Sequence, residues 1–142
     1  MATTRTAAAH WEGSLMDGSG EVALQSSGVG SFAVSWPARS EEPGGKTSPE
    51  ELIAAAHSTC YSMALSHALA QAGTPPTSVD TTAEVTFQPG TGITGIALSV
   101  VGNVPGITAE QFEAAAQDAK KNCPVSQALA AVPITLETSF TG

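Results

Sequence analysis

The sequence predicts a single α+β domain that spans residues 1–142 and contains antiparallel sheets and a long central helix. A chain of 142 residues suits one apolar core and leaves little room for a second. Its apolar residues alternate in some stretches, as in half-buried strands, and recur at helical spacing in others. No stretch repeats another. The expected order is three strands, a long helix, two strands, two helices and a closing strand (βββ-α-ββ-αα-β).

Three short strands are expected before the long helix. Residues 4–13 and 20–27 have the composition of strands and are separated by a turn-rich segment. Residues 31–36 alternate bulky apolar with small side chains, which suits a half-buried strand, and Pro37 ends it. Residues 37–47 are polar and rich in Gly and Pro, so a loop is expected there.

The start of the long helix is well specified. Ser48 is a good N-cap residue, and Pro49 suits the first helical position. Glu51 stands three residues past Ser48, where a capping-box partner belongs. Apolar residues continue at helical spacing until Gly73 and the prolines after it end the helix. The sequence therefore predicts a helix of about 24 residues.

Residues 79–88 and 95–104 alternate as two strands joined by a glycine-rich turn. Within that turn, residues 90–95 match the pattern G-x-G-x-x-G of dinucleotide-binding loops. Such a loop must open a helix, whereas the residues that follow alternate and are rich in β-branched side chains. A plain hairpin turn is therefore expected.

Two helices and a strand complete the chain. Thr108 is an N-cap residue with Gln111 three residues later, and Pro124 suits the start of a short helix over residues 124–132, with Cys123 as its N-cap. Residues 133–140 are expected to form the closing strand. The first of these helices has an inner stripe of Phe112, Ala115, Ala116 and Ala119.

Composition narrows the classes of partner. The 42% hydrophobic and 13% charged residues exclude a disordered chain, and 13 acidic against 5 basic residues, a net charge of -8, argue against nucleic acid. No run approaches the roughly 18 apolar residues of a membrane span, and the N-terminus lacks the features of a signal peptide. The cytoplasm is the expected compartment. His10 and His67 have no spacing that suggests a metal site.

Two cysteines are too few for a closed four-cysteine zinc site, and a permanent disulfide is not expected in a reducing compartment. Cys60 and Cys123 are therefore either inert core residues or redox-active thiols. Cys123 has Lys120 and Lys121 before it and an expected helix start after it, both of which favour a thiolate. Cys60 lies in the middle of the long helix, so a cation that activates it must come from elsewhere in the fold.

Arg39 is the best candidate for that cation, with Arg5 second, because bases are scarce in this chain. An arginine beside a buried thiol needs a carboxylate partner, and Glu50 is the natural choice. Glu50 lies ten positions before Cys60, about 15 Å along a helix, so the two meet only if the helix breaks or a second copy supplies one of them. The alternative is that Glu50 merely complements the helix dipole.

Four stretches of the chain carry specific motifs: SPEELIAAAHSTCYSMALS, PTSVDTTAEV, VPGIT and NCPVSQAL. Together they closely resemble the osmotically inducible protein C (OsmC) family of thiol hydroperoxide reductases, and the likeness extends from AHWEG to ITLETSF. The resemblance implies an OsmC-like fold and an intertwined homodimer with two active sites built from both subunits. It also implies reduction of organic hydroperoxides, and more weakly of hydrogen peroxide, to alcohols in oxidative and osmotic stress defence. No metal, flavin, haem or other cofactor is implied.

Matching positions give the residues their implied roles. Cys60 would be the peroxidatic thiol that becomes a sulfenic acid, and Cys123 would resolve it as a Cys60–Cys123 disulfide. Arg39 would stabilise the thiolate and polarise the peroxide, while Glu50 would orient Arg39. A dithiol reductant, with a lipoyl-type dithiol as the candidate, would complete the cycle.

Two other classes of function stay open. His57 lies three residues before Cys60, which permits a Cys–His hydrolase or acyltransferase, although such a histidine is more often structural. A non-catalytic dimeric protein that binds a small ligand is the third class. Cys123 distinguishes a peroxidase from these two alternatives, because neither of them needs a second thiol in an activating sequence context.

Overall fold

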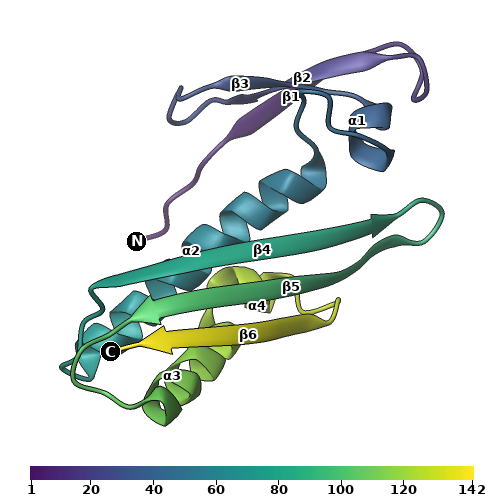
Figure 1. The fold of residues 1–142 in the computed structure, drawn as a ribbon. Helices are drawn as coiled ribbons and strands as arrows, with labels where there is room; N and C mark the ends of the chain where they lie inside the picture. Colours follow the sequence, from purple (N-terminus) through teal and green to yellow (C-terminus); the bar gives the residue numbers. More distant parts are fainter. The chain divides into compact units, whose positions relative to one another are not determined.

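The computed structural model describes all residues, 1–142, and has the α+β composition that the sequence predicts. The chain divides into two compact units, Met1–Leu52 and Ile53–Gly142, and α2 begins in the first and continues in the second. That one domain spans the chain stays a prediction. The elements are β1 (Ala7–Glu12), β2 (Ser19–Leu24), β3 (Ser31–Val34), α1 (Trp36–Ser40), α2 (Pro49–Gln71), β4 (Ser78–Gln88), β5 (Gly92–Asn103), α3 (Ala109–Asn122), α4 (Pro124–Ala128) and β6 (Ile134–Thr141) (Figure 1).

The first unit contains an antiparallel sheet in the order β1-β2-β3. Ala9 pairs with Val22 and Val22 with Phe32, so these three side chains share one face of the sheet. In the whole unit only Ala38 and Glu50 are buried. The first unit therefore has no apolar core of its own.

A loop was expected over residues 37–47, but residues 37–40 belong to the short helix α1. That part of the prediction was wrong. The Ser35 hydroxyl caps the helix by accepting a hydrogen bond from the Ala38 N–H (3.2 Å), and Pro37 lies in the first turn. Arg39 consequently lies on a helix. The signal is a serine N-cap with a proline in the first turn, as at the start of α2, except that Trp36 separates Ser35 from Pro37.

Helix α2 runs without interruption from Pro49 to Gln71, close to the predicted length. The Ser48 hydroxyl accepts a hydrogen bond from the Glu51 N–H (3.1 Å), as an N-cap should. The Glu51 carboxylate accepts from the Thr47 hydroxyl (2.6 Å), so only half of the predicted capping box forms. The helix ends at Gln71, and two residues later Gly73 has a φ of 86°, a left-handed conformation that favours glycine.

The second unit contains the sheet β4-β5-β6. Strands β4 and β5 form the predicted hairpin, and residues 90–95 lie in and after its turn and lead into β5, not a helix. Strand β6 pairs with β5 in parallel, so this sheet is mixed and the prediction of antiparallel sheets was wrong here. The physical reason is the long connection through α3 and α4, which returns the chain in the same direction as β5.

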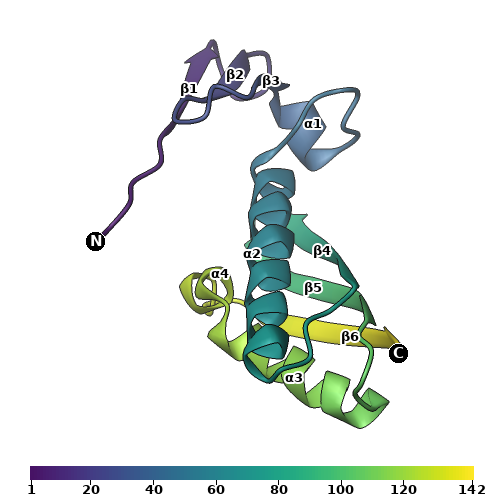
Figure 2. The ribbon, with the colours of Figure 1, turned by 90° about the vertical axis from the view of Figure 1, so that its left-hand side faces the viewer.

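Helices α2, α3 and α4 cover one face of this sheet (Figures 1 and 2). Thr108 and Gln111 form both halves of the predicted capping box at the start of α3 (2.9 and 3.1 Å). Cys123 is the N-cap of α4, as predicted, although α4 ends earlier than expected, at Ala128. The apolar core lies between the helices and β5 and consists of Tyr61, Leu65, Leu69, Ile96, Leu98, Val100, Val104, Phe112, Ala116, Ala119 and Cys123.

Candidate functional site

The structure brings the four predicted site residues together as two pairs. Arg39 and Glu50 contact each other in the first unit, and Cys60 and Cys123 interact in the second. Arg5, the second candidate for the cation, is exposed and donates a hydrogen bond to the Thr4 carbonyl (3.0 Å). Of the two arginines, Arg39 is the one held by a carboxylate.

The pairing of Arg39 with Glu50 is bidentate. Arg39 Nε donates to Glu50 Oε1 and Oε2 (3.0 and 3.2 Å), and Arg39 Nη2 donates to Oε2 (2.9 Å). The Glu50 side chain is 8% exposed and that of Arg39 31%. A carboxylate that is so deeply buried requires a charged partner, and the double contact fixes the plane of the guanidinium. Glu50 therefore does more than complement the helix dipole, since it holds Arg39 in one orientation.

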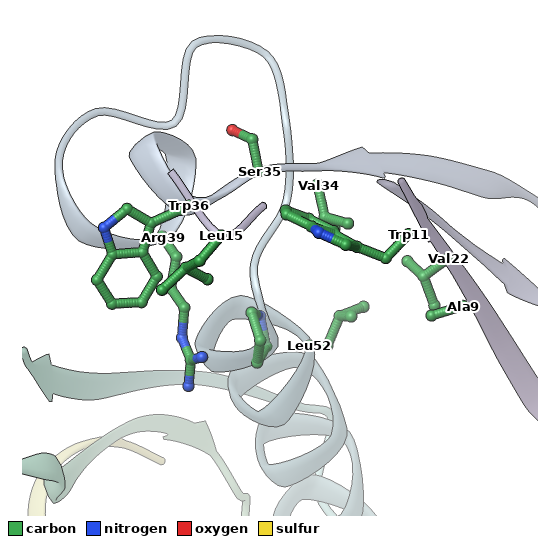
Figure 3. A pocket seen from close by; sticks show the side chains of 10 residues that line it. Ala9, Trp11, Leu15, Val22, Val34, Ser35, Trp36, Arg39 and Leu52 are labelled. Carbon is green, nitrogen blue, oxygen red and sulfur yellow. The ribbon is translucent and has the colours of Figure 1, made fainter. Parts of the chain in front are cut away.

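Arg39 also lies on the wall of a largely apolar cavity of about 290 Å³ in the first unit. Figure 3 shows Arg39 beside Leu15 and Trp36, with Trp11 on the other side of the cavity. The remaining lining residues are Ala9, Val22, Val34, Ser35, Pro49 and Leu52. The cavity thus combines an apolar surface with a single oriented cation.

The two thiols differ in accessibility. Both are free; Cys60, on α2, is half-buried, whereas Cys123, at the start of α4, is fully buried. Burial raises the pKa of the Cys60 thiol, a hydrogen bond with the Val125 backbone lowers it, and the neighbouring Cys123 thiol raises it again. The net effect is a raised pKa, and no cation in the second unit is among the causes. A nearby cation would favour the thiolate and oppose this rise in pKa.

The sequence context of Cys123 favours a thiolate, but the structure places this thiol in the apolar core. Its side chain is fully buried, and the Lys120 ammonium donates to the Ile134 carbonyl (3.3 Å). The helix that follows Cys123 has only five residues. Cys60 is thus the more accessible thiol, and the buried Cys123 thiol interacts with it from the interior.

His57 is fully buried on α2, and its Nε2 lies 2.7 Å from Ser126 Oγ on α4. Its Nδ1 is buried without a hydrogen-bond partner, and burial lowers the pKa of the imidazole. The ring is therefore neutral and bonded to Ser126, not to Cys60, which disfavours the Cys–His alternative. Ser126 was not predicted as a site residue, because a single serine in a short helix carries no local signal.

Acid should destabilise the protein through His57. Because burial lowers the folded-state pKa, the unfolded chain binds the proton more readily below the ordinary histidine pKa of about 6.5. Stability is retained above that pH and is lost below it, by up to about 1.4 kcal/mol per pH unit. Urea unfolding at fixed protein concentration measures this slope. His57→Gln should flatten it; an equal slope in both proteins would exclude His57 as its source.

Neither a metal site nor a membrane span is evident in the structure. No three His, Cys, Asp or Glu side chains are grouped so that they could hold a metal ion. No helix is both long and apolar enough to cross a bilayer.

Known proteins match this chain over most of its length. A model of the OsmC-like protein family matches residues 42–137. Peroxiredoxin OsmC of Escherichia coli (strain K12) is 48% identical over 132 residues, which are 91% of this chain and 91% of that protein. Peroxiredoxin OsmC of Shigella flexneri matches with the same figures.

Solved structures also match this chain over its whole length. An organic hydroperoxide resistance protein OsmC from Legionella pneumophila has a TM-score of 0.71 at 26% identity, covering 100% of this chain and 99% of that chain. An OsmC like protein from Mycoplasma pneumoniae has a TM-score of 0.75 at 12% identity and covers 100% of both chains. The second likeness concerns the fold alone.

Proposed function

This chain belongs to the OsmC-like protein family, and on that premise we propose that it is a cysteine peroxidase that reduces organic hydroperoxides, and hydrogen peroxide more weakly, to alcohols. The protein serves oxidative and osmotic stress defence. The observation that carries the proposal is the pair of free thiols in one buried cluster, of which only Cys60 is accessible. A single thiol would suffice for acyl transfer, and a binding protein would need neither.

Cys60 carries the first step. Its thiolate attacks the terminal peroxide oxygen, so that an S–O bond forms and the O–O bond breaks. The alkoxide that leaves takes a proton and becomes the alcohol. The Cys60 sulfur has then been oxidised by two electrons to a sulfenic acid, and the hydroperoxide has been reduced by two.

Cys123 carries the second step. Its sulfur forms a bond with the Cys60 sulfur while the S–OH bond breaks, and hydroxide leaves with the thiol proton as water. A dithiol reductant, with a lipoyl-type dithiol as the candidate, then exchanges with the disulfide and restores both thiols. The reducing environment that this cycle requires is that of the cytoplasm, where we place the protein.

Arg39 and Glu50 act on the thiol of a partner chain in this proposal. Because α2 is continuous, the separation of ten positions from Glu50 to Cys60 corresponds to about 15 Å along its axis. Two copies related by a two-fold axis would allow the Arg39–Glu50 pair of one to reach Cys60 of the other. Arg39 then favours the thiolate and polarises the peroxide, and the apolar cavity beside it accommodates the organic part of the substrate.

The first sheet supports an intertwined homodimer. One of its faces carries apolar side chains in register, including Ala9, Val22 and Phe32, yet the unit buries no core of its own. Exposed Trp11, at 39%, adds to this surface. A surface of this kind is stable in water when a second surface covers it, and a second copy provides one.

The test is a count of thiols. One equivalent of an organic hydroperoxide, added to the reduced protein, should remove two thiols per chain and yield a Cys60–Cys123 disulfide within each chain. Thiol titration and mass spectrometry of the peptides measure both. Retention of both thiols would contradict the enzymatic proposal, and loss of one thiol per chain would contradict the role of Cys123.

A further inference from the structure

A buried hydrogen bond joins the two segments that carry the thiols. His57 Nε2 and Ser126 Oγ are 2.7 Å apart, with His57 0% and Ser126 5% exposed. His57 lies three residues before Cys60 on α2, and Ser126 lies three residues after Cys123 on α4. The contact therefore connects α2 with α4 within about one helical turn of each cysteine.

Helix α4 is short and follows α3 directly, and the backbone N–H of its N-cap Cys123 donates to the Ala119 carbonyl of α3 (2.9 Å). It has five residues, and its N-cap Cys123 makes no side-chain capping bond. A single helical turn is unstable by itself, so tertiary contacts decide its position. Val125 and Leu129 pack against the core, but apolar packing is non-directional. The His57–Ser126 hydrogen bond, in contrast, constrains both distance and direction, and the hydrogen bond between the Val125 backbone and the Cys60 thiol is a further directional contact of α4 with α2.

We propose that His57 and Ser126 are positioning residues that hold the Cys123 thiol against Cys60 and so govern disulfide formation, not the first reaction with hydroperoxide. The inference rests on the proposed function for the order of the steps. Disulfide formation requires the two sulfurs to approach to about 2.05 Å with a dihedral angle near ~90°. A small displacement of α4 therefore slows this step. The attack of Cys60 on the hydroperoxide uses no side chain of α4 and depends on this helix only through the Val125 backbone hydrogen bond, which lowers the pKa of Cys60.

The state of the imidazole fits a positioning role. If Nε2–H donates to Ser126 Oγ, the unpartnered Nδ1 is a bare acceptor, which costs less than a buried N–H without a partner. Burial disfavours the protonated ring and so keeps His57 neutral. A neutral ring that is enclosed on all sides acts as a spacer between the helices.

The experiment compares the two chemical steps in single variants and in one double variant. Ser126→Ala removes the bond but leaves the imidazole without any partner, which itself destabilises the fold. His57→Leu/Ser126→Ala replaces both polar groups with apolar ones, so no buried polar group is left unsatisfied. If the hydrogen bond only stabilises the fold, the rate of disulfide formation should be largely restored in the double variant. If the bond positions the thiols, this rate should stay low.

We expect the first oxidation of Cys60, measured as sulfenic acid formation, to stay within about twofold of the parent in both variants. Disulfide formation should be about tenfold slower in both, and excess hydroperoxide should convert more Cys60 to sulfinic acid. His57→Gln keeps a side-chain N–H and should recover much of the rate. Ser62→Ala is the matched control. It also removes a hydroxyl from α2, but this hydroxyl donates to Thr81 on β4 and makes no contact with α4 in the hydrogen bond that is lost.

A second measurement needs no hydroperoxide. In a glutathione redox buffer, the equilibrium constant for the Cys60–Cys123 disulfide reports how well the fold holds the two thiols together. We expect it to be about tenfold lower in the double variant. An unchanged constant, equal slowing of both steps, or a normal rate of disulfide formation in the double variant would each overturn the inference. Failure of the peroxidase proposal would appear separately, as a parent protein that keeps its thiols.

Discussion

Replacing Cys60 by serine should abolish hydroperoxide turnover, with a loss of at least about 10³-fold, because the nucleophile is removed. Replacing Cys123 should have a different result. Cys123→Ser retains the accessible Cys60 thiol and should consume one equivalent of hydroperoxide per chain before it stops as a sulfenic or over-oxidised acid. Hydroperoxide consumption with a dithiol reductant, together with the mass of the Cys60 peptide, measures both results.

The expected difference between these variants follows from burial. Cys60 is half-buried and Cys123 is fully buried, so an incoming hydroperoxide should reach the first and not the second. Equal behaviour of the two variants would mean that the peroxidatic and resolving roles are wrongly assigned. One stoichiometric reaction in Cys60→Ser and none in Cys123→Ser would mean that the roles are reversed.

Local signals predicted most element boundaries correctly. Ser48 with Pro49, and Thr108 with Gln111, mark helix starts because a side-chain oxygen and a backbone N–H a few residues later satisfy each other. The same chemistry at Ser35 marks α1, but the Gly- and Pro-rich composition of residues 37–47 favoured a loop. Composition was the weaker guide there, because a single capping bond and a proline in the first turn are enough to start one helical turn.

Features that depend on distant contacts were not predictable in the same way. The direction of β6 depends on which strand it pairs with, and an alternating pattern is the same for parallel and antiparallel neighbours. Ser126 meets His57 across 69 positions of sequence, and neither residue shows this locally. The Arg39–Glu50 pair was predictable although it is not a local pattern. A thiolate is stabilised by a nearby cation, and the chain has so few basic residues that few could supply it.

The relation between the Arg39–Glu50 pair and Cys60 can be tested by removing the arginine. Arg39→Ala should raise the pKa of Cys60, because an opposite charge within a few ångströms favours the thiolate and burial opposes it. Peroxide reduction at neutral pH should fall on the order of 10²-fold, as expected for a lost cation at a developing charge. Glu50→Ala should cost less, because Arg39 keeps its charge and loses only its orientation.

The measurement is the pH dependence of Cys60 alkylation in a Cys123→Ser background. Lys46→Ala is a matched control, since it removes an exposed positive charge from the same unit and should leave the midpoint unchanged. Arg39→Lys keeps the charge but not the bidentate contact, so its midpoint should lie between those of the parent and Arg39→Ala. Because Arg39→Ala leaves Glu50 buried without its partner, Arg39→Ala/Glu50→Ala separates lost stability from lost activation. If the midpoint stays at the parent value in both Arg39→Ala and the double variant, Arg39 does not activate the thiol. Arg5→Ala in the same assay then tests whether Arg5 supplies the cation.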